Sequence, residues 1–191
     1  MEQFNFNEFK KIIGNTEFFV YRTRGGDCYP ILKEKFWSIK SEETLKVIVP
    51  QDIIIDYSFA DETVGQLFQE IWDDKISDRY LIVQVSRVDQ FENIEASINI
   101  RKLLAIIINE KCQPIMVGRR GKDSKLIATL DETLNKLNDE QTLTASQLVQ
   151  ESGLEINTAS MRLKRLYEAH LAKREPSNED PRTFIYHSIL K

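Results

Sequence analysis

The stretch between residues 144 and 170 constrains the fold most, because it carries two helical repeats separated by one glycine. The first repeat has an apolar face formed by Ala145, Leu148 and Val149. Gly153 follows at the point where a helix ends in a left-handed residue, and either Asn157 or Thr158 could cap the next helix. The second repeat has its own apolar face, formed by Ala159, Leu163, Leu166 and either His170 or Leu171. The spacing therefore predicts a helix, a tight turn and a second helix.

The opposite face of the second helix is basic. Thr158, Met161, Arg162 and Arg165 follow one another at the spacing of residues that share one side of a helix. After the helix, residues 171–175 and 183–189 have the composition of two strands. The loop between them, residues 176–182, is rich in Ser, Asn, Asp and Pro.

This order of elements resembles a winged helix-turn-helix domain, with residues 157–169 as the recognition helix and residues 176–182 as the wing. The resemblance covers the last third of the chain. Its one departure is His170, which stands where such domains usually have glycine; histidine tolerates a positive φ better than most residues. The resemblance implies contacts with double-stranded DNA, to bases from the helix and to phosphates from the wing. The implied DNA-binding residues are Asn157, Thr158, Ser160, Met161, Arg162, Lys164, Arg165, Lys173, Arg174 and Arg182.

The charge of the chain agrees with a local DNA-binding surface only. The formal net charge is -4, so affinity for nucleic acid cannot come from an overall basic field. Between Asn157 and Arg174 there are five basic residues and one acidic residue, Glu168, which gives a local charge of +4.

The first 40 residues predict a short helix followed by a β-hairpin. Apolar residues at helical spacing lead to Gly14, where the helix would end. Residues 16–23 favour a strand, residues 24–27 a turn and residues 28–33 a return strand. No helix with Lys-Ser or Lys-Thr follows the glycine pair in the turn, which argues against a phosphate-binding loop.

From Leu45 onward, short apolar runs alternate with longer amphipathic segments. The strands are expected at residues 46–49, 53–57, 80–86 and 114–117, and the helices at 59–72 and 91–109. Strands that alternate with helices predict an α/β domain with a mixed, partly parallel sheet. The expected fold class is therefore α/β for this domain, followed by α+β for the winged helix-turn-helix domain.

The string from Ile55 to Glu62, Ile-Asp-Tyr-Ser-Phe-Ala-Asp-Glu, closes a strand and opens a helix. It resembles the turn of the STAS domain (sulfate transporter and anti-sigma-factor antagonist), and more closely a STAS-like family with Ser-Phe-Ala-Asp-Glu at that place. The resemblance covers residues 45–118 and implies that Ser58 is a serine phosphorylated by a partner kinase, with Asp56, Phe59 and Asp61 beside it. In the alternative interpretation, Asp56 or Ser58 only caps the helix.

The charged segment 119–123 is the expected domain boundary. Residues 1–120 would form the STAS-like regulatory domain with its N-terminal hairpin, and residues 121–191 the winged helix-turn-helix domain. The second domain would begin with a helix in which apolar residues repeat at helical spacing: Leu126, Ile127, Leu130, Leu134 and Leu137.

No pattern in the sequence indicates an enzyme, a metal or a cofactor. The Walker loop, the dinucleotide fingerprint and the nucleophile elbow are all missing. Cys28 and Cys112 lie far apart, and His170 and His187 are the only histidines that could join them in a metal site. No apolar run approaches 18 residues and the N-terminus lacks signal-peptide features, so we expect a cytoplasmic protein without a membrane segment.

Two functions are compatible with these features. The first is a transcription regulator that reads DNA with the winged domain and receives a signal in the STAS-like domain. We expect it to be a homodimer, because a single recognition helix makes few base contacts. The second is a partner-switching protein that binds a serine kinase or another regulator around Ser58 and does not read DNA.

Overall fold

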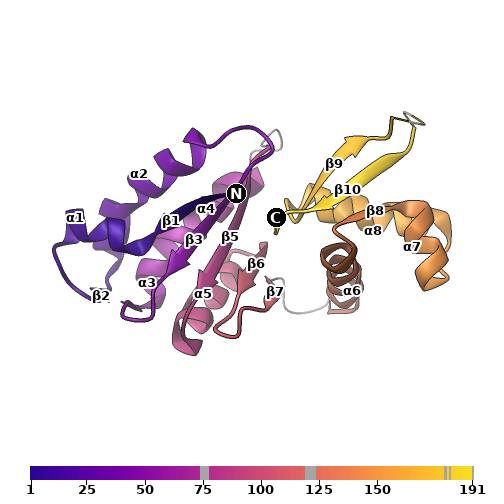
Figure 1. Ribbon diagram of the computed structural model, residues 1–191. Helices are drawn as coiled ribbons and strands as arrows, with labels where there is room; N and C mark the ends of the chain where they lie inside the picture. The colour runs from indigo at the N-terminus through magenta and orange to yellow at the C-terminus, as the bar shows by residue number, and fades with distance from the viewer. Residues whose placement is uncertain (74–77, 119–123, 179, 181, 191) are drawn as a thin grey trace. The chain divides into compact units, whose positions relative to one another are not determined.

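The computed structural model describes residues 1–73, 78–118, 124–178, 180 and 182–190. The chain forms two compact units, Met1–Arg120 and Gly121–Lys191 (Figure 1). The expected charged connector, residues 119–123, lies outside the described residues. The protein is mixed α/β with parallel and antiparallel strand pairs, as the alternation of strands and helices predicted.

The N-terminal unit contains a five-stranded sheet. Its strands, in spatial order, are β1 (Glu2–Asn5), β3 (Thr44–Val49), β5 (Tyr80–Val85), β6 (Leu104–Ile108) and β7 (Pro114–Gly118). The first four are parallel to one another, and β7 is antiparallel to β6. Parallel neighbours need a crossover connection, and helices supply most of it here.

The helices of this unit share one core with one face of the sheet. They are α2 (Arg22–Ser38), α3 (Tyr57–Ala60), α4 (Gln66–Asp73) and α5 (Val88–Ile100), with the π-helical turn η2 (Asp61–Gly65) between α3 and α4. Every second residue of β3 and β5 joins this core, and Ala105 and Ile107 of β6 do so as well; Val47, Val83 and Ile107 are fully buried. The period of two is what a sheet with one face against helices requires.

Small elements precede α2. The 3-10 turn η1 (Phe6–Phe9) continues into α1 (Lys10–Ile13), which ends at Gly14 with φ 86, as predicted. The strand β2 (Phe18–Phe19) then pairs in parallel with β4 (Ile54–Ile55).

The predicted N-terminal β-hairpin is wrong, because α2 occupies both the expected turn and the expected return strand. The glycine pair lies inside this helix. A Cβ atom on Gly25 would lie 2.8 Å from Cβ of Glu62 and 3.2 Å from the carbonyl oxygen of Phe59. Gly25 therefore permits a close approach of α2 to the segment after β4, which is a use of glycine that differs from a turn.

The predicted helix over residues 91–109 is also wrong in its second half. The helix α5 ends at Ile100, Lys102 adopts a φ of 58, and β6 follows from Leu104. The sequence of β6, Leu-Ala-Ile-Ile-Ile, is apolar throughout and almost fully buried. Continuous apolar runs are typical of central parallel strands, and over so short a length they resemble a buried helix.

The C-terminal unit contains three helices and a small antiparallel sheet. Its elements in chain order are α6 (Ser124–Glu140), β8 (Thr142–Thr144), α7 (Ala145–Ser152), α8 (Ile156–Glu168), β9 (Ala172–Pro176) and β10 (Phe184–Ser188). The strand order is β8-β10-β9, with β10 antiparallel to both neighbours. The two predicted strands after α8 are confirmed.

The turn between α7 and α8 also has the predicted form. Thr144 and Gln147 form a capping box at the start of α7, and Gly153 ends this helix in the left-handed region with φ 67. The predicted cap of α8 is wrong, because the helix begins one residue before Asn157 and its N-cap Glu155 makes no side-chain cap hydrogen bond. His170 adopts a φ of 56, as its place after the helix predicted.

Candidate nucleic-acid interface and regulatory turn

The helix α8 has one buried face and one exposed face. Ala159, Leu163 and Leu166 are fully buried. The exposed residues are Ile156, Asn157, Thr158, Ser160, Met161, Lys164, Arg165 and Glu168. The exposed fraction of Met161 is 50%, so this apolar side chain stands open beside polar and basic ones. Such a mixture could donate hydrogen bonds to base edges and pack against a thymine methyl group.

Arg162 does not belong to the exposed face. Only 16% of its side chain is exposed, and its Nη1 lies 3.5 Å from Oε2 of Glu132 in α6. The prediction that Arg162 lies on the outer face is therefore wrong. At 100° per residue, its position falls at the border between the buried and exposed sides, and the neighbouring helix supplies the ion pair.

Two of the five basic residues behind the local charge of +4 form ion pairs within the unit, and Glu132 is the only one of their partners that the charge count does not already include. Nζ of Lys164 lies 3.4 Å from Oε1 of Glu168, one turn later on α8, and Arg162 faces Glu132. Among the described residues, Arg165 has no ion-pair partner and remains exposed. A DNA-binding surface here would depend on few charges.

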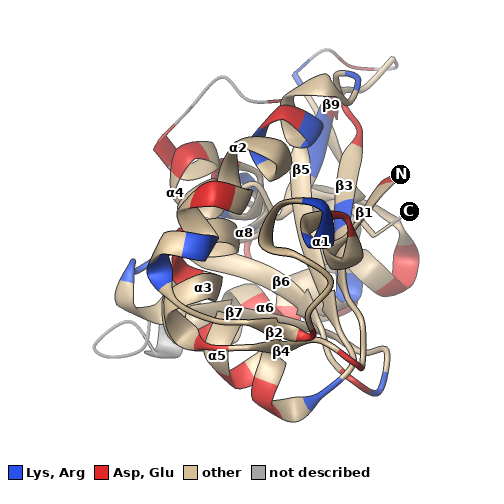
Figure 2. Cartoon of the chain, turned by 90° about the vertical axis from the view of Figure 1, so that its left-hand side faces the viewer, with Lys and Arg blue, Asp and Glu red and all other residues tan. Residues whose placement is uncertain are grey.

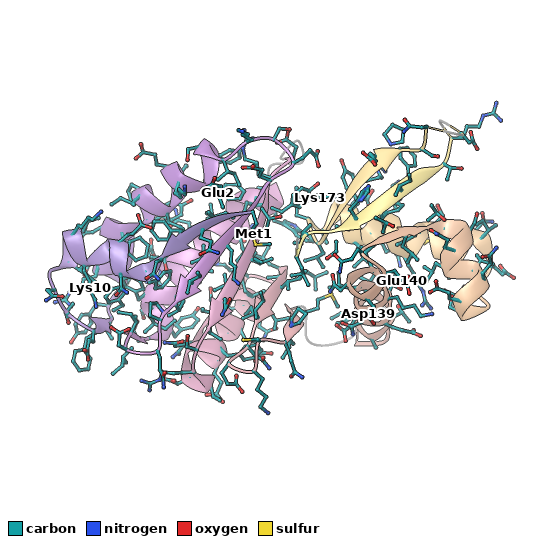
Figure 3. All side chains as sticks on the ribbon, in the orientation of Figure 1. Met1, Glu2, Lys10, Asp139, Glu140 and Lys173 are labelled. Carbon is teal, nitrogen blue, oxygen red and sulfur yellow. The ribbon has the colours of Figure 1, made fainter. Side chains whose placement is uncertain are left out.

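The two basic residues of β9 lie on opposite faces of the small sheet. The guanidinium carbon of Arg174 lies 4.1 Å from the ring centre of Tyr167 in α8 and 4.3 Å from that of Phe184 in β10. Lys173, labelled in Figure 3 near the start of β9, pairs in register with His187. Because side chains alternate along a strand, Lys173 faces away from the side on which Arg174 meets α8. The guanidinium of Arg174 is thus held between two aromatic rings of the same unit.

The described part of the wing, residues 176–178, 180 and 182, is ordered by Asp180. Its Oδ1 accepts a hydrogen bond from the backbone N–H of Arg182 at 3.0 Å, and its Oδ2 accepts one from the hydroxyl of Thr183 at 3.1 Å. Arg182 is exposed. Its side chain thus stands at the tip of the β9–β10 hairpin, where a long cation could reach a phosphate.

In the N-terminal unit, Asp56 is the residue that caps α3. Its Oδ1 accepts a hydrogen bond from the backbone N–H of Phe59 at 2.7 Å, and its Oδ2 accepts one from the N–H of Tyr21 at 3.1 Å. Tyr21 has a φ of 76, a conformation that non-glycine residues rarely adopt. One carboxylate therefore stabilises both the start of α3 and the strained residue before α2.

Ser58 lies in the first turn of α3 and is partly exposed. Among the residues that the structure describes, none forms a hydrogen bond with its hydroxyl. Of the two capping candidates, Asp56 has this role and Ser58 does not. The hydroxyl is thus available to an incoming group, at a helix end where backbone N–H groups favour an anion.

Asp61 is a buried carboxylate that connects three helices. Its exposed fraction is 6%. Oδ1 accepts hydrogen bonds from the hydroxyl of Ser97 in α5 at 3.1 Å and from Nε of Arg101, the C-cap residue of α5, at 2.7 Å. Oδ2 lies 3.2 Å from Nη2 of Arg22, the first residue of α2. Burial raises the pKa of the Asp61 carboxyl, but Arg101, Ser97 and Arg22 together outweigh it, so the pKa is lowered.

Gly65 lacks a side chain that would otherwise occupy the space around the Asp61 carboxylate. A Cβ atom on Gly65 would lie 2.0 Å from the hydroxyl oxygen of Ser97 and 3.1 Å from Nε of Arg101. The glycine is thus required by the hydrogen bonds of Asp61 and lies in the π-helical turn η2. The sequence motif contains Asp61, but its partners lie 36 to 40 residues away and carry no local signal.

Phe59 lies in a cluster of aromatic rings. Its ring centre is 5.4 Å from that of Phe19, 6.0 Å from that of Phe9 and 6.1 Å from that of Phe6. All four side chains are fully buried. Phe59 is therefore a core residue, whereas Ser58 before it is partly exposed.

The described residues contain no group of three or more His, Cys, Asp or Glu side chains that could hold a metal ion. Cys28 and Cys112 are free thiols, and burial raises the pKa of Cys28 to about 12, which keeps it protonated. Charges of both signs are interspersed on the helices of the N-terminal unit (Figure 2).

No protein-family model matches this chain, and no curated protein matches it either. Within the described part of the chain, no helix is both long and apolar enough to cross a membrane.

Proposed function

We propose that the protein is a DNA-binding transcription regulator, with a winged helix-turn-helix domain in its C-terminal unit and a STAS-like input domain in its N-terminal unit. The observation that carries the proposal is the exposed polar face of α8, which follows a tight turn and precedes a two-stranded hairpin. In this arrangement a helix enters the major groove and the hairpin lies along the phosphate backbone. The base-reading residues would be Asn157, Thr158, Ser160, Met161, Lys164 and Arg165, with Arg182 and Lys173 on phosphates.

Replacing Arg165 with alanine should weaken binding to the preferred DNA sequence about ten- to hundredfold, the range expected when an arginine–guanine contact is lost. Arg165 is exposed on α8 and has no ion-pair partner among the described residues. Binding would be measured by gel shift with genomic fragments at about 50 mM salt, where nonspecific contacts are still strong.

Arg162→Ala is the matched control, because it removes the same side chain from the same helix at a position turned toward Glu132. It should change DNA affinity little. Equal effects of the two substitutions, or no retention of any duplex by the wild-type protein, would contradict the proposal. The same titration gives the number of chains per duplex, which we propose is two.

A second candidate function is partner switching at the turn around Ser58. The specific observation in its favour is the unpaired, partly exposed hydroxyl, near which Tyr21 is 64% exposed and Phe18 is 54% exposed. Exposed aromatic side chains are enriched in protein interfaces. A serine kinase or another regulator would then be the partner, and the C-terminal unit need not read DNA.

Substitutions at Ser58 can distinguish a contribution to helix stability from a role as a regulatory input. Ser58→Ala should change the free energy of unfolding by no more than about 0.5 kcal/mol, because the hydroxyl has no hydrogen bond to lose with any residue that the structure describes. Ser58→Asp should alter DNA affinity about fivefold or more if the turn is a regulatory input, with little change in melting temperature. Ser38→Asp, at an exposed serine at the end of α2, controls for the added charge. Identical DNA affinity in all three variants would exclude control of DNA binding by Ser58.

A further inference from the structure

Arg174 connects the β9–β10 hairpin to α8. Its guanidinium group lies between the rings of Tyr167 in α8 and Phe184 in β10, with distances to the ring centres of 4.1 and 4.3 Å. Both distances lie within the range of about 6 Å over which an aromatic face attracts a cation. Arginine is suited to this position because its planar group can stack on two faces at once.

The sheet register explains why these residues meet. Arg174 stands directly opposite Tyr186, and Phe184 stands opposite Pro176, two residues further along β9. Directly opposed and diagonal residues on one face of an antiparallel pair are close enough to contact each other. The helix α8 covers this face, because Tyr186 is 4% exposed and Ala172 is fully buried on the same side.

The pKa of Tyr186 also reflects the position of Arg174 among aromatic side chains. Burial raises the pKa of its hydroxyl, and the neighbouring Arg174 guanidinium lowers it only in part. Arg174 thus contacts three aromatic side chains from two elements, α8 and β10.

We infer that Arg174 fixes the orientation of the β9–β10 hairpin relative to α8, and so positions the wing beside the helix that reads DNA. Its role in DNA recognition rests on the function proposed above, whereas its role in hairpin orientation does not. Arg174 is therefore a positioning residue, and it contacts neither bases nor phosphates.

The first test is amide hydrogen exchange on the full chain, which measures how often each segment opens. In Arg174→Ala, exchange in β9 and β10 should become at least about tenfold faster, while α7 and the N-terminal unit stay unchanged and report that the protein is folded. Arg174→Lys should behave in the same way, because it keeps the charge and loses the planar group. Phe184→Ala, which removes one of the two rings, should also accelerate exchange in the hairpin.

Lys173→Ala is the matched control, since it removes the same charge from the adjacent residue of the same strand, on the opposite face. Its hairpin should exchange at the wild-type rate. Wild-type exchange in Arg174→Ala, or full rescue by Arg174→Lys, would overturn the inference.

The second test is the salt dependence of DNA binding. Arg174→Ala should weaken binding about tenfold without changing the slope of log affinity against log salt, whereas loss of a phosphate contact lowers that slope by about one. A lower slope would show that Arg174 contacts DNA and would overturn the inference. If the wild-type protein binds no DNA, the proposed function fails and the exchange experiment alone decides the role of Arg174.

Discussion

Replacement of Asp61 by alanine is expected to lower the free energy of unfolding by about 3–5 kcal/mol, the usual cost of breaking a buried ion pair. The substitution leaves Arg101, whose side chain is only 22% exposed, without the carboxylate that accepts its hydrogen bond. It also removes the contact that joins α2 to α5 through Arg22 and Ser97. Urea denaturation of the two proteins at neutral pH measures the difference.

The control is Glu62→Ala at the next position. Glu62 is 26% exposed and pairs at 2.6 Å with Arg22, whose side chain is 58% exposed. A solvent-exposed pair of this kind contributes only about 0–1 kcal/mol. Equal losses in Asp61→Ala and Glu62→Ala would contradict the assignment of Asp61 as the buried connection between the helices.

The pH dependence of the free energy of unfolding is an independent measure of the contribution of Asp61. The pKa of Asp61 is lowered in the folded protein, so the unfolded state binds its proton at higher pH than the folded state does. The stabilisation is fully present above the ordinary aspartate pKa of about 3.9 and is lost as the pH falls through the lower folded value. Asp61→Asn should reduce this loss of stability below about pH 4.

Phe59→Ala is the substitution with the second largest expected effect, again a loss of about 3–5 kcal/mol. Phe59 is fully buried and contacts Phe6, Phe9 and Phe19, which all come from the first twenty residues. The cavity would loosen the packing of this N-terminal segment on the helices. Thermal and urea unfolding measure the loss.

Phe18→Ala is the corresponding control, because Phe18 precedes Phe19 in β2 and is 54% exposed. It should change stability by no more than about 0.5 kcal/mol. If Phe59→Ala cost no more than Phe18→Ala, the aromatic cluster would not stabilise the fold.

The C-terminal unit could be predicted because its signals are local. Each of these signals involves only a few neighbouring residues. They are the helical spacing of apolar residues in α7 and α8, the left-handed Gly153 and the polar segment between β9 and β10. The exposure of individual side chains was less predictable. Arg162 has the helical position of a border residue, and only the presence of Glu132 on α6 turns it inward.

The errors in the N-terminal unit arose from contacts between distant residues. Gly25 and Gly26 have the local pattern of a turn, yet Gly25 is needed where α2 approaches Glu62. The run from Leu104 to Ile108 is apolar at every position, so its period distinguishes a strand from a helix only once neighbouring strands are known. The motif from Asp56 to Asp61 was recognisable, but the partners of Asp61 on α2 and α5 were not.

The π-helical turn at Asp61–Gly65 has a consequence for the length of this segment. A π turn contains one residue more than the α-helical turn it replaces, and such turns arise as single-residue insertions within α-helices. One residue corresponds to a rotation of about 100° around the helix axis. The turn therefore determines the direction in which Asp61 points relative to the apolar face of α4. Deleting a single residue here would restore regular helix geometry, but Asp61 and Leu67 could no longer both face their present neighbours. Chains that share this design should therefore vary in sequence along the segment while keeping its length constant.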